Sequence, residues 1–130
     1  MSFEHKASIF YGVKVDKDTF FKDCFRFIEM KPISELRKAT ADYAEKAVED
    51  VDGDDLWDYL HDEDYVIDCD FLDDIYVGDN YLTVGENDNC ETFELEHLTK
   101  CSTLTFSIKE FISTLYPDKV AKLRLISWAL

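Results

Sequence analysis

Hydrophobic and polar positions recur with different periods along the chain, and each period predicts an element. Residues 7–15 are rich in β-branched and aromatic side chains, which predicts a buried strand. Asp16 is placed to cap a helix that begins near Lys17. In that helix, hydrophobic side chains recur three and four positions apart, as one helical face requires. This predicted stripe consists of Phe21, Cys24, Phe25 and Ile28, widened by Phe20 and Phe27.

Two further helices are predicted before the chain changes period. The first opens at Pro32 and Ser34 and ends at Gly53. The second covers residues 55–62 and is capped by Asp54. The inner face of the longer helix is predicted to hold Leu36, Ala39, Tyr43, Ala47 and Val51.

From Tyr65 onward the period is two, which is typical of strands. Residues 65–71 are predicted to form one strand, with its hydrophobic side chains on one face and Asp68 and Asp70 on the other. Residues 75–77 and 81–84 are predicted to pair as a β-hairpin around a Gly78-Asp79-Asn80 turn. Residues 92–95 are a candidate for a further strand.

The C-terminal part predicts a helix followed by a strand. Ser107 and Glu110 have the spacing of a capping box, and Pro117 is placed to end the helix. The run 120–130 fits both periods, and we assign it to a strand. The prediction is therefore a single compact α+β domain over residues 1–130, with three to four helices packed on a mostly antiparallel or mixed sheet.

The distribution of charge is the most unusual feature of the chain. The 130 residues are 46% hydrophobic and carry a formal net charge of −15. Residues 42–96 hold 21 Asp and Glu side chains and a single base, Lys46, whereas the remaining residues carry a net positive charge. Hydrophobic and aromatic residues interrupt this acidic segment regularly, so we expect it to be folded rather than a disordered tail. Its carboxylates should then occupy fixed positions on a surface.

Composition and motifs exclude several classes of function. Strong acidity disfavours direct binding to nucleic acid or to an anionic membrane. No hydrophobic run approaches the length of a membrane span, and the N-terminus predicts no signal peptide. The cysteines lack a C-x-x-C pair, which favours free, mostly buried thiols and a cytoplasmic location. They are Cys24, Cys69, Cys90 and Cys101.

No motif identifies a reaction, a metal site or a cofactor. The run from Asp50 to Asp55 resembles a calcium loop, but the glycine at position 6 and the glutamate at position 12 are missing. Cys90, His97 and Cys101 lack the spacing of a structural zinc site. We therefore predict no catalytic residue, metal or cofactor. A carboxylate-based metal enzyme and a calcium-binding protein remain alternatives, because so many acids are present.

The leading hypothesis is an acidic interaction module for a basic, nucleic-acid-binding protein. In composition the chain is similar to the DNA-mimic proteins found among phage and plasmid anti-defence factors, which share acidity rather than a motif. Mimicry would place rows of fixed carboxylates where phosphates normally bind, with Trp57, Tyr59 or Tyr76 as aromatic contacts. An acidic structural or adaptor protein without mimicry is the second alternative. The predicted contact residues are Asp55, Asp58, Asp62, Asp68, Asp70, Asp73 and Asp74.

Overall fold

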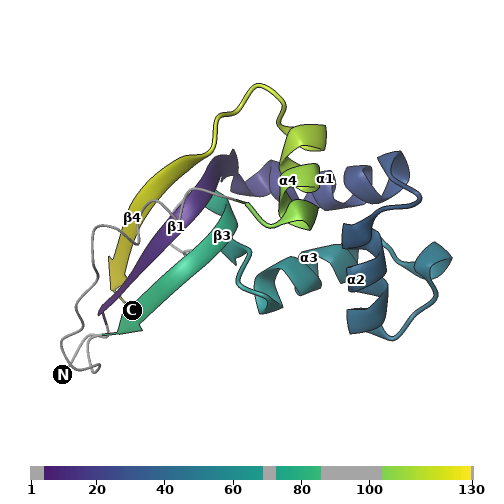
Figure 1. The fold of residues 1–130 in the computed structure, drawn as a ribbon, viewed down its shortest axis with the longest axis horizontal. Coiled ribbons are helices and arrows are strands. Elements are labelled where there is room, and N and C mark those ends of the chain that lie inside the picture. Colours follow the sequence, from purple (N-terminus) through teal and green to yellow (C-terminus); the bar gives the residue numbers. More distant parts are fainter. Residues whose placement is uncertain (1–4, 69–72, 86–103, 130) are drawn as a thin grey trace.

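The computed structural model describes residues 5–68, 73–85 and 104–129 (Figure 1). The elements follow in the order β1 (His5–Asp16), α1 (Lys17–Met30), α2 (Glu35–Ala44), the 3₁₀ helix η1 (Val48–Asp50), α3 (Gly53–Asp62), β2 (Val66–Ile67), β3 (Asp74–Gly85), α4 (Phe106–Leu115) and β4 (Lys122–Ala129). In Figure 1 the long strands cross the left of the molecule and the helices gather on the right. The predicted α+β class is confirmed.

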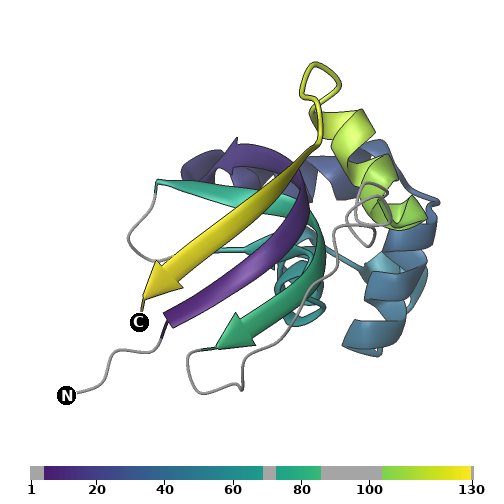
Figure 2. The same ribbon diagram turned by 60° about the vertical axis from the view of Figure 1, so that its left-hand side comes forward.

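The described strands form one antiparallel sheet in the order β2-β3-β1-β4. Figure 2 shows the three long strands side by side in this curved sheet, with β1 between β3 and β4. The predicted strand over residues 7–15 is confirmed by β1, and the assignment of the C-terminal run to a strand is confirmed by β4. Of the predicted strand over residues 65–71, the described residues 65–68 contain the strand Val66–Ile67, and the rest lies outside the described residues, as does the predicted strand over residues 92–95.

The predicted hairpin around Gly78 is wrong, because β3 runs without a turn along the whole of β1. Gly78 pairs with Gly12, and a Cβ atom on Gly78 would lie 2.1 Å from the carbonyl oxygen of Tyr11. These glycines therefore allow two strands to approach closely instead of forming a turn. The register shifts by one residue between Ile9 and Phe10, which places a β-bulge in β3.

The second helix is shorter than the sequence predicts, and the next helix begins earlier. Helix α2 ends at Ala44, where Glu45 adopts a left-handed conformation with φ of 56°. Gly53 is the first residue of α3 instead of the end of the preceding helix. The cap of α3 is Asp52 instead of Asp54: its side chain accepts from the backbone N–H of Asp55, whose own side chain accepts from the Asp52 N–H.

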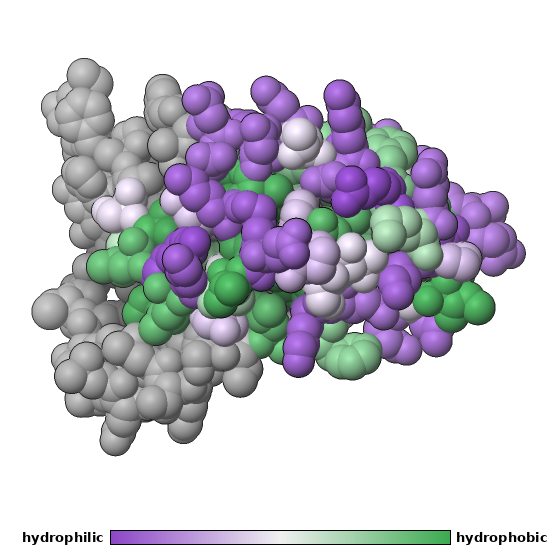
Figure 3. Space-filling model, turned by 90° about the horizontal axis from the view of Figure 1, so that it is seen from above, coloured by the Kyte–Doolittle hydropathy of each residue, from purple (hydrophilic) through white to green (hydrophobic). Residues whose placement is uncertain are grey.

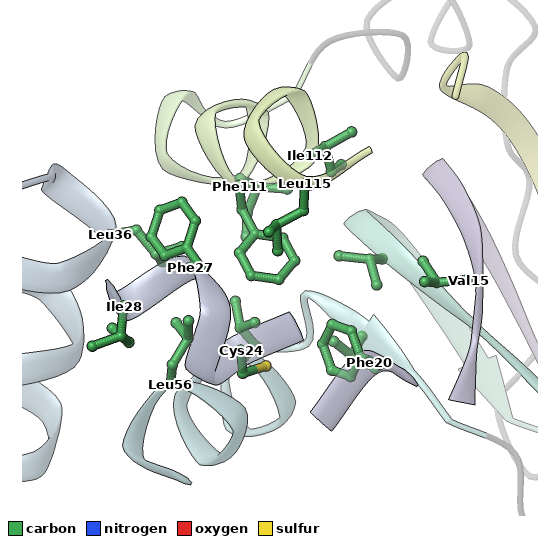
Figure 4. Close-up of a cluster of buried hydrophobic side chains, with 14 of the residues drawn as sticks. Val15, Phe20, Cys24, Phe27, Ile28, Leu36, Leu56, Phe111, Ile112 and Leu115 are labelled. Atoms are coloured by element: carbon green, nitrogen blue, oxygen red, sulfur yellow. The ribbon is translucent and has the colours of Figure 1, made fainter. Parts of the chain in front are cut away.

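Helix α1 begins where predicted, with the Asp16 side chain accepting from the N–H groups of residues 18 and 19. Its buried face, however, is centred on Phe20, Cys24 and Phe27 rather than on Phe21, whose side chain is 42% exposed. Figure 4 shows these side chains between α4, α3 and the sheet, with Phe111 of α4 directed toward them. The sequence alone does not decide which face of α1 is buried, because phenylalanines flank the stripe on both sides.

The start of α4 is anchored to the sheet, and among the described residues no side chain caps it. It begins at Phe106, so Ser107 lies inside the helix and the predicted capping box with Glu110 is wrong. The Asp79 carboxylate of β3 accepts hydrogen bonds from the Thr105 N–H (2.5 Å) and hydroxyl (2.9 Å). The helix ends two residues before Pro117, in agreement with the prediction.

Seen from above, the described surface is mostly hydrophilic, with smaller hydrophobic areas between the polar side chains (Figure 3). No helix within residues 5–68, 73–85 and 104–129 is long and apolar enough to cross a membrane.

Candidate functional site

Exposed carboxylates gather on one continuous part of the chain, from the end of α2 through η1 to the end of α3. We call this the acidic surface. The only Lys or Arg between residues 42 and 64 is Lys46. Its ammonium binds the Asp55 carboxylate at 2.8 Å, so it offsets an inner acid rather than the exposed ones. The acidic surface consists of Asp42, Glu45, Glu49, Asp50, Asp52, Asp54, Asp58, Asp62, Glu63 and Asp64, all exposed.

Helix α3 fixes the most regular part of this surface. Leu56 and Leu60 are fully buried against the core, which sets the rotation of the helix. Asp54, Asp58 and Asp62 are therefore exposed on the opposite side, four residues apart. At a rise of about 1.5 Å per residue, these carboxylates recur at intervals of about 6 Å along the helix. We call these three residues the α3 row.

Asp55, which the sequence analysis predicts as a contact residue together with Asp58 and Asp62, is engaged within the chain. Its side chain is only 15% exposed and bonds both to Lys46 and to the backbone of Asp52. Burial alone would raise the pKa of Asp55, but the hydrogen bonds from Lys46 and Asp52 outweigh it and lower the pKa. The sequence assigned Asp54 to the cap and missed it as a surface residue. Asp54 lies four residues before Asp58, and this spacing in the sequence indicates that both side chains share one face of the helix.

The end of the α3 row is tied to α2. The hydroxyl of Tyr43 donates to the carboxylate of Asp62. This hydrogen bond is the main reason that the pKa of Tyr43 is raised to about 12, with smaller contributions from burial and from the charges of Asp62, Asp58 and Glu63. The bond keeps α2 and α3 in register, so that the acids of both helices hold fixed relative positions.

The other predicted contact residues do not join the acidic surface as a strand row. Strand β2 ends at Ile67, and Asp68 instead binds Lys17 at 2.8 Å, with its side chain 21% exposed. Asp70 lies outside the described residues. Asp73 is exposed, whereas Asp74 pairs with Lys14 at 3.3 Å.

Beside the acidic surface lies a pocket of about 320 Å³ between the start of α1 and α3. Its aromatic wall includes Trp57 and Phe21, whose rings meet edge to face at 6.2 Å. Its polar lining is Lys17, Asp18 and Asp68. We call this the aromatic pocket.

His61 lies behind Trp57, with the two ring centroids 3.9 Å apart. Its Nδ1 is 2.8 Å from the carbonyl oxygen of Trp57, so Nδ1 carries a proton and donates. Nε2 lies 3.6 Å from the Asp68 carboxylate. In the neutral ring this nitrogen bears a lone pair, so the contact is attractive only when His61 is protonated.

The described residues show little that suggests metal or thiol chemistry. Among them, no group of three or more His, Cys, Asp or Glu side chains is placed to hold a metal ion. In the predicted calcium-like run, Asp52 and Asp55 are occupied by the cap of α3. Cys24 is buried and free, and burial, with the neighbouring Asp23, raises the pKa of its thiol. Cys69, Cys90, His97 and Cys101 lie outside the described residues.

Comparisons of this chain with protein-family models, curated protein sequences and solved structures found no match.

Proposed function

We propose that this protein is an acidic interaction module whose acidic surface occupies the nucleic-acid-binding site of a basic protein. The observation that carries the proposal is the α3 row, three exposed carboxylates held at regular intervals on a helix whose opposite face is buried. Duplex DNA presents about one phosphate charge per 3.4 Å along each strand. Because each strand also winds around the axis, its neighbouring phosphates are farther apart than this axial rise, and carboxylates about 6 Å apart are comparable with neighbouring phosphates of one strand.

The concentration of charge supports the same proposal. Like charges held together on a folded surface repel one another and oppose folding, so this arrangement does not serve stability. It would, however, accelerate association with a basic partner through long-range attraction. Such association should weaken steeply with added salt.

The aromatic pocket supplies the hydrophobic contacts that charge alone does not. Interface residues that contribute most to affinity are enriched in aromatic side chains surrounded by polar groups. Phe21 is substantially exposed, and Trp57 lies on the same helix as the α3 row. An Arg or Lys side chain of the partner would find aromatic faces there together with the carboxylate of Asp18, because Asp68 is already paired with Lys17.

The test is reversal of the α3 row. The immobilised protein should retain basic nucleic-acid-binding proteins from a lysate at low salt, and duplex DNA should displace them. The triple variant Asp54→Lys, Asp58→Lys, Asp62→Lys should lose this retention. A matched control, Glu29→Lys, Glu35→Lys, Asp118→Lys, reverses three exposed acids elsewhere and changes the net charge equally.

Circular dichroism should show that both triple variants are folded. If the control triple loses retention as completely as the α3-row triple, net charge rather than the acidic surface is responsible. Retention that survives row reversal and about 1 M salt, where the screening length is about 3 Å, would overturn the proposal.

A further inference from the structure

The register of β1 and β4 places three positive side chains on one face of the sheet. Gly12 pairs with Lys122 and Phe10 pairs with Arg124. Because alternate residues of a strand share a face, Lys14 lies on the same face as Lys122 and Arg124. The intervening Val13 and Val15 are buried in the main core with the helices. The positive face is therefore the one opposite the helices.

The connection that arches from α4 to β4 in Figure 1 adds a fourth positive side chain, Lys119. Together these residues line an open pocket of about 260 Å³, which we call the basic pocket. No acidic side chain lines it. Within the described part of the chain, the acid that pairs with one of its cations is Asp74, 3.3 Å from Lys14. The lining residues are Val13, Lys14, Lys119, Val120, Lys122 and Arg124.

Arg124 lines the basic pocket and packs against an aromatic ring. Its guanidinium lies over the ring of Tyr76, 5.4 Å from the ring centroid. Its Nη1 atom is buried and, among the described residues, has no hydrogen-bond partner. A buried N–H group without an acceptor is costly, more so on a charged side chain. The pocket therefore offers four positive side chains, one of which is a guanidinium with an unused donor.

We propose that the basic pocket binds a small phosphate-bearing ligand, independently of the acidic surface. Arginine forms paired hydrogen bonds with phosphate oxygens, and lysines add charge around them. The volume equals that of about nine water molecules at roughly 30 Å³ each, which suits a compact anion such as diphosphate. At physiological salt, screening over about 8 Å shields such a ligand from distant carboxylates. A long polyanion would extend from the pocket into the field of a chain with net charge −15.

The test uses inorganic pyrophosphate as the probe, titrated into the full chain by calorimetry. Binding should saturate at one ligand per chain, and amide NMR signals should shift at residues 14 and 119–124. The double variant Lys119→Gln, Lys122→Gln should bind at least about tenfold more weakly, because two charge-assisted contacts are removed. The matched control, Lys22→Gln, Lys109→Gln, removes two exposed lysines outside the pocket and should retain the affinity.

A second variant tests the guanidinium itself. Arg124→Lys keeps the charge and removes the paired donors, so it should also weaken binding. Arg124 is half-buried, so this substitution can impair folding. In that case the double variant of the exposed Lys119 and Lys122 still tests the proposal. Absence of saturable binding, equal weakening in the control pair, or binding of a single-stranded oligonucleotide but not of pyrophosphate would each overturn the proposal.

Discussion

A hydrogen bond between Tyr116 and Asp23 joins the end of α4 to the middle of α1. The hydroxyl of Tyr116 donates to the Asp23 carboxylate at 2.7 Å, and Arg26 lies 3.7 Å from the other carboxylate oxygen. Asp23 is almost fully buried. Burial raises the pKa of Tyr116 well above its usual value, and the bond to Asp23 raises it further. The Tyr116 side chain therefore links α4 to α1, and it can donate this hydrogen bond only while its hydroxyl keeps its proton.

This residue predicts a loss of stability in alkali. Unfolded Tyr116 releases its proton near pH 10, whereas the folded protein retains it. Rising pH above about 10 therefore favours the unfolded state, and the free energy of unfolding should fall. Tyr116→Phe should lower that free energy by about 1–2 kcal/mol at neutral pH and make its decline in alkali shallower. Urea unfolding of both proteins over a pH series measures this, and an equally steep decline in the variant would contradict it.

At the scale of elements, α3 positions the acidic surface, and its start is defined by Asp52. The capping box between Asp52 and Asp55 satisfies two backbone N–H groups that would otherwise lack partners. Asp52→Ala should therefore cost about 1 kcal/mol of unfolding free energy. Asp54→Ala is the matched control, because it removes a neighbouring exposed carboxylate but no cap hydrogen bond. If urea unfolding gave the larger loss for Asp54→Ala, the cap would be misassigned.

The same elements show what the sequence could and could not predict. The existence of α3 followed from Leu56 and Leu60, because hydrophobic spacing is a local property. The path of β3 did not, because Gly78 resembles a turn glycine until Gly12 is known to lie opposite it.

The acidic segment was likewise visible from its composition, but the availability of each carboxylate was not. Three acids of this segment pair with lysines that lie nine or more residues away in the sequence. Lys46 binds Asp55, Lys17 binds Asp68, and Lys14 binds Asp74. Only the three-dimensional structure brings these partners together, and it leaves the α3 row exposed.

At the scale of the whole molecule, charge is separated in space as it is in sequence. The acidic surface lies on α2, η1 and α3, whereas the basic pocket lies at the β4 edge of the sheet. Figure 1 shows β4 and these helices on opposite sides of the molecule. The two proposed sites can therefore be tested by separate variants.

This separation predicts how salt affects stability. The repulsion among the ten carboxylates of the acidic surface opposes folding, and raising the salt from about 0.01 M to about 0.15 M shortens the screening length from about 30 Å to about 8 Å. The free energy of unfolding should therefore rise with salt. Urea is a suitable denaturant because it is uncharged, and tryptophan fluorescence can report unfolding.

The two triple variants show where the repulsion arises. Reversal of Asp54, Asp58 and Asp62 replaces repulsion with attraction on the acidic surface, so the rise in stability with salt should largely disappear. Reversal of Glu29, Glu35 and Asp118 changes the net charge equally but leaves the acidic surface intact, so more of the rise should remain. Equal salt dependence in the two variants would mean that overall charge, and not the acids fixed by α3, opposes folding. Only screening by salt or a positive partner reduces the repulsion among the carboxylates of the acidic surface. A clear difference in salt dependence between the two variants would therefore also identify the acidic surface as the place where a bound basic partner adds most to the free energy of unfolding.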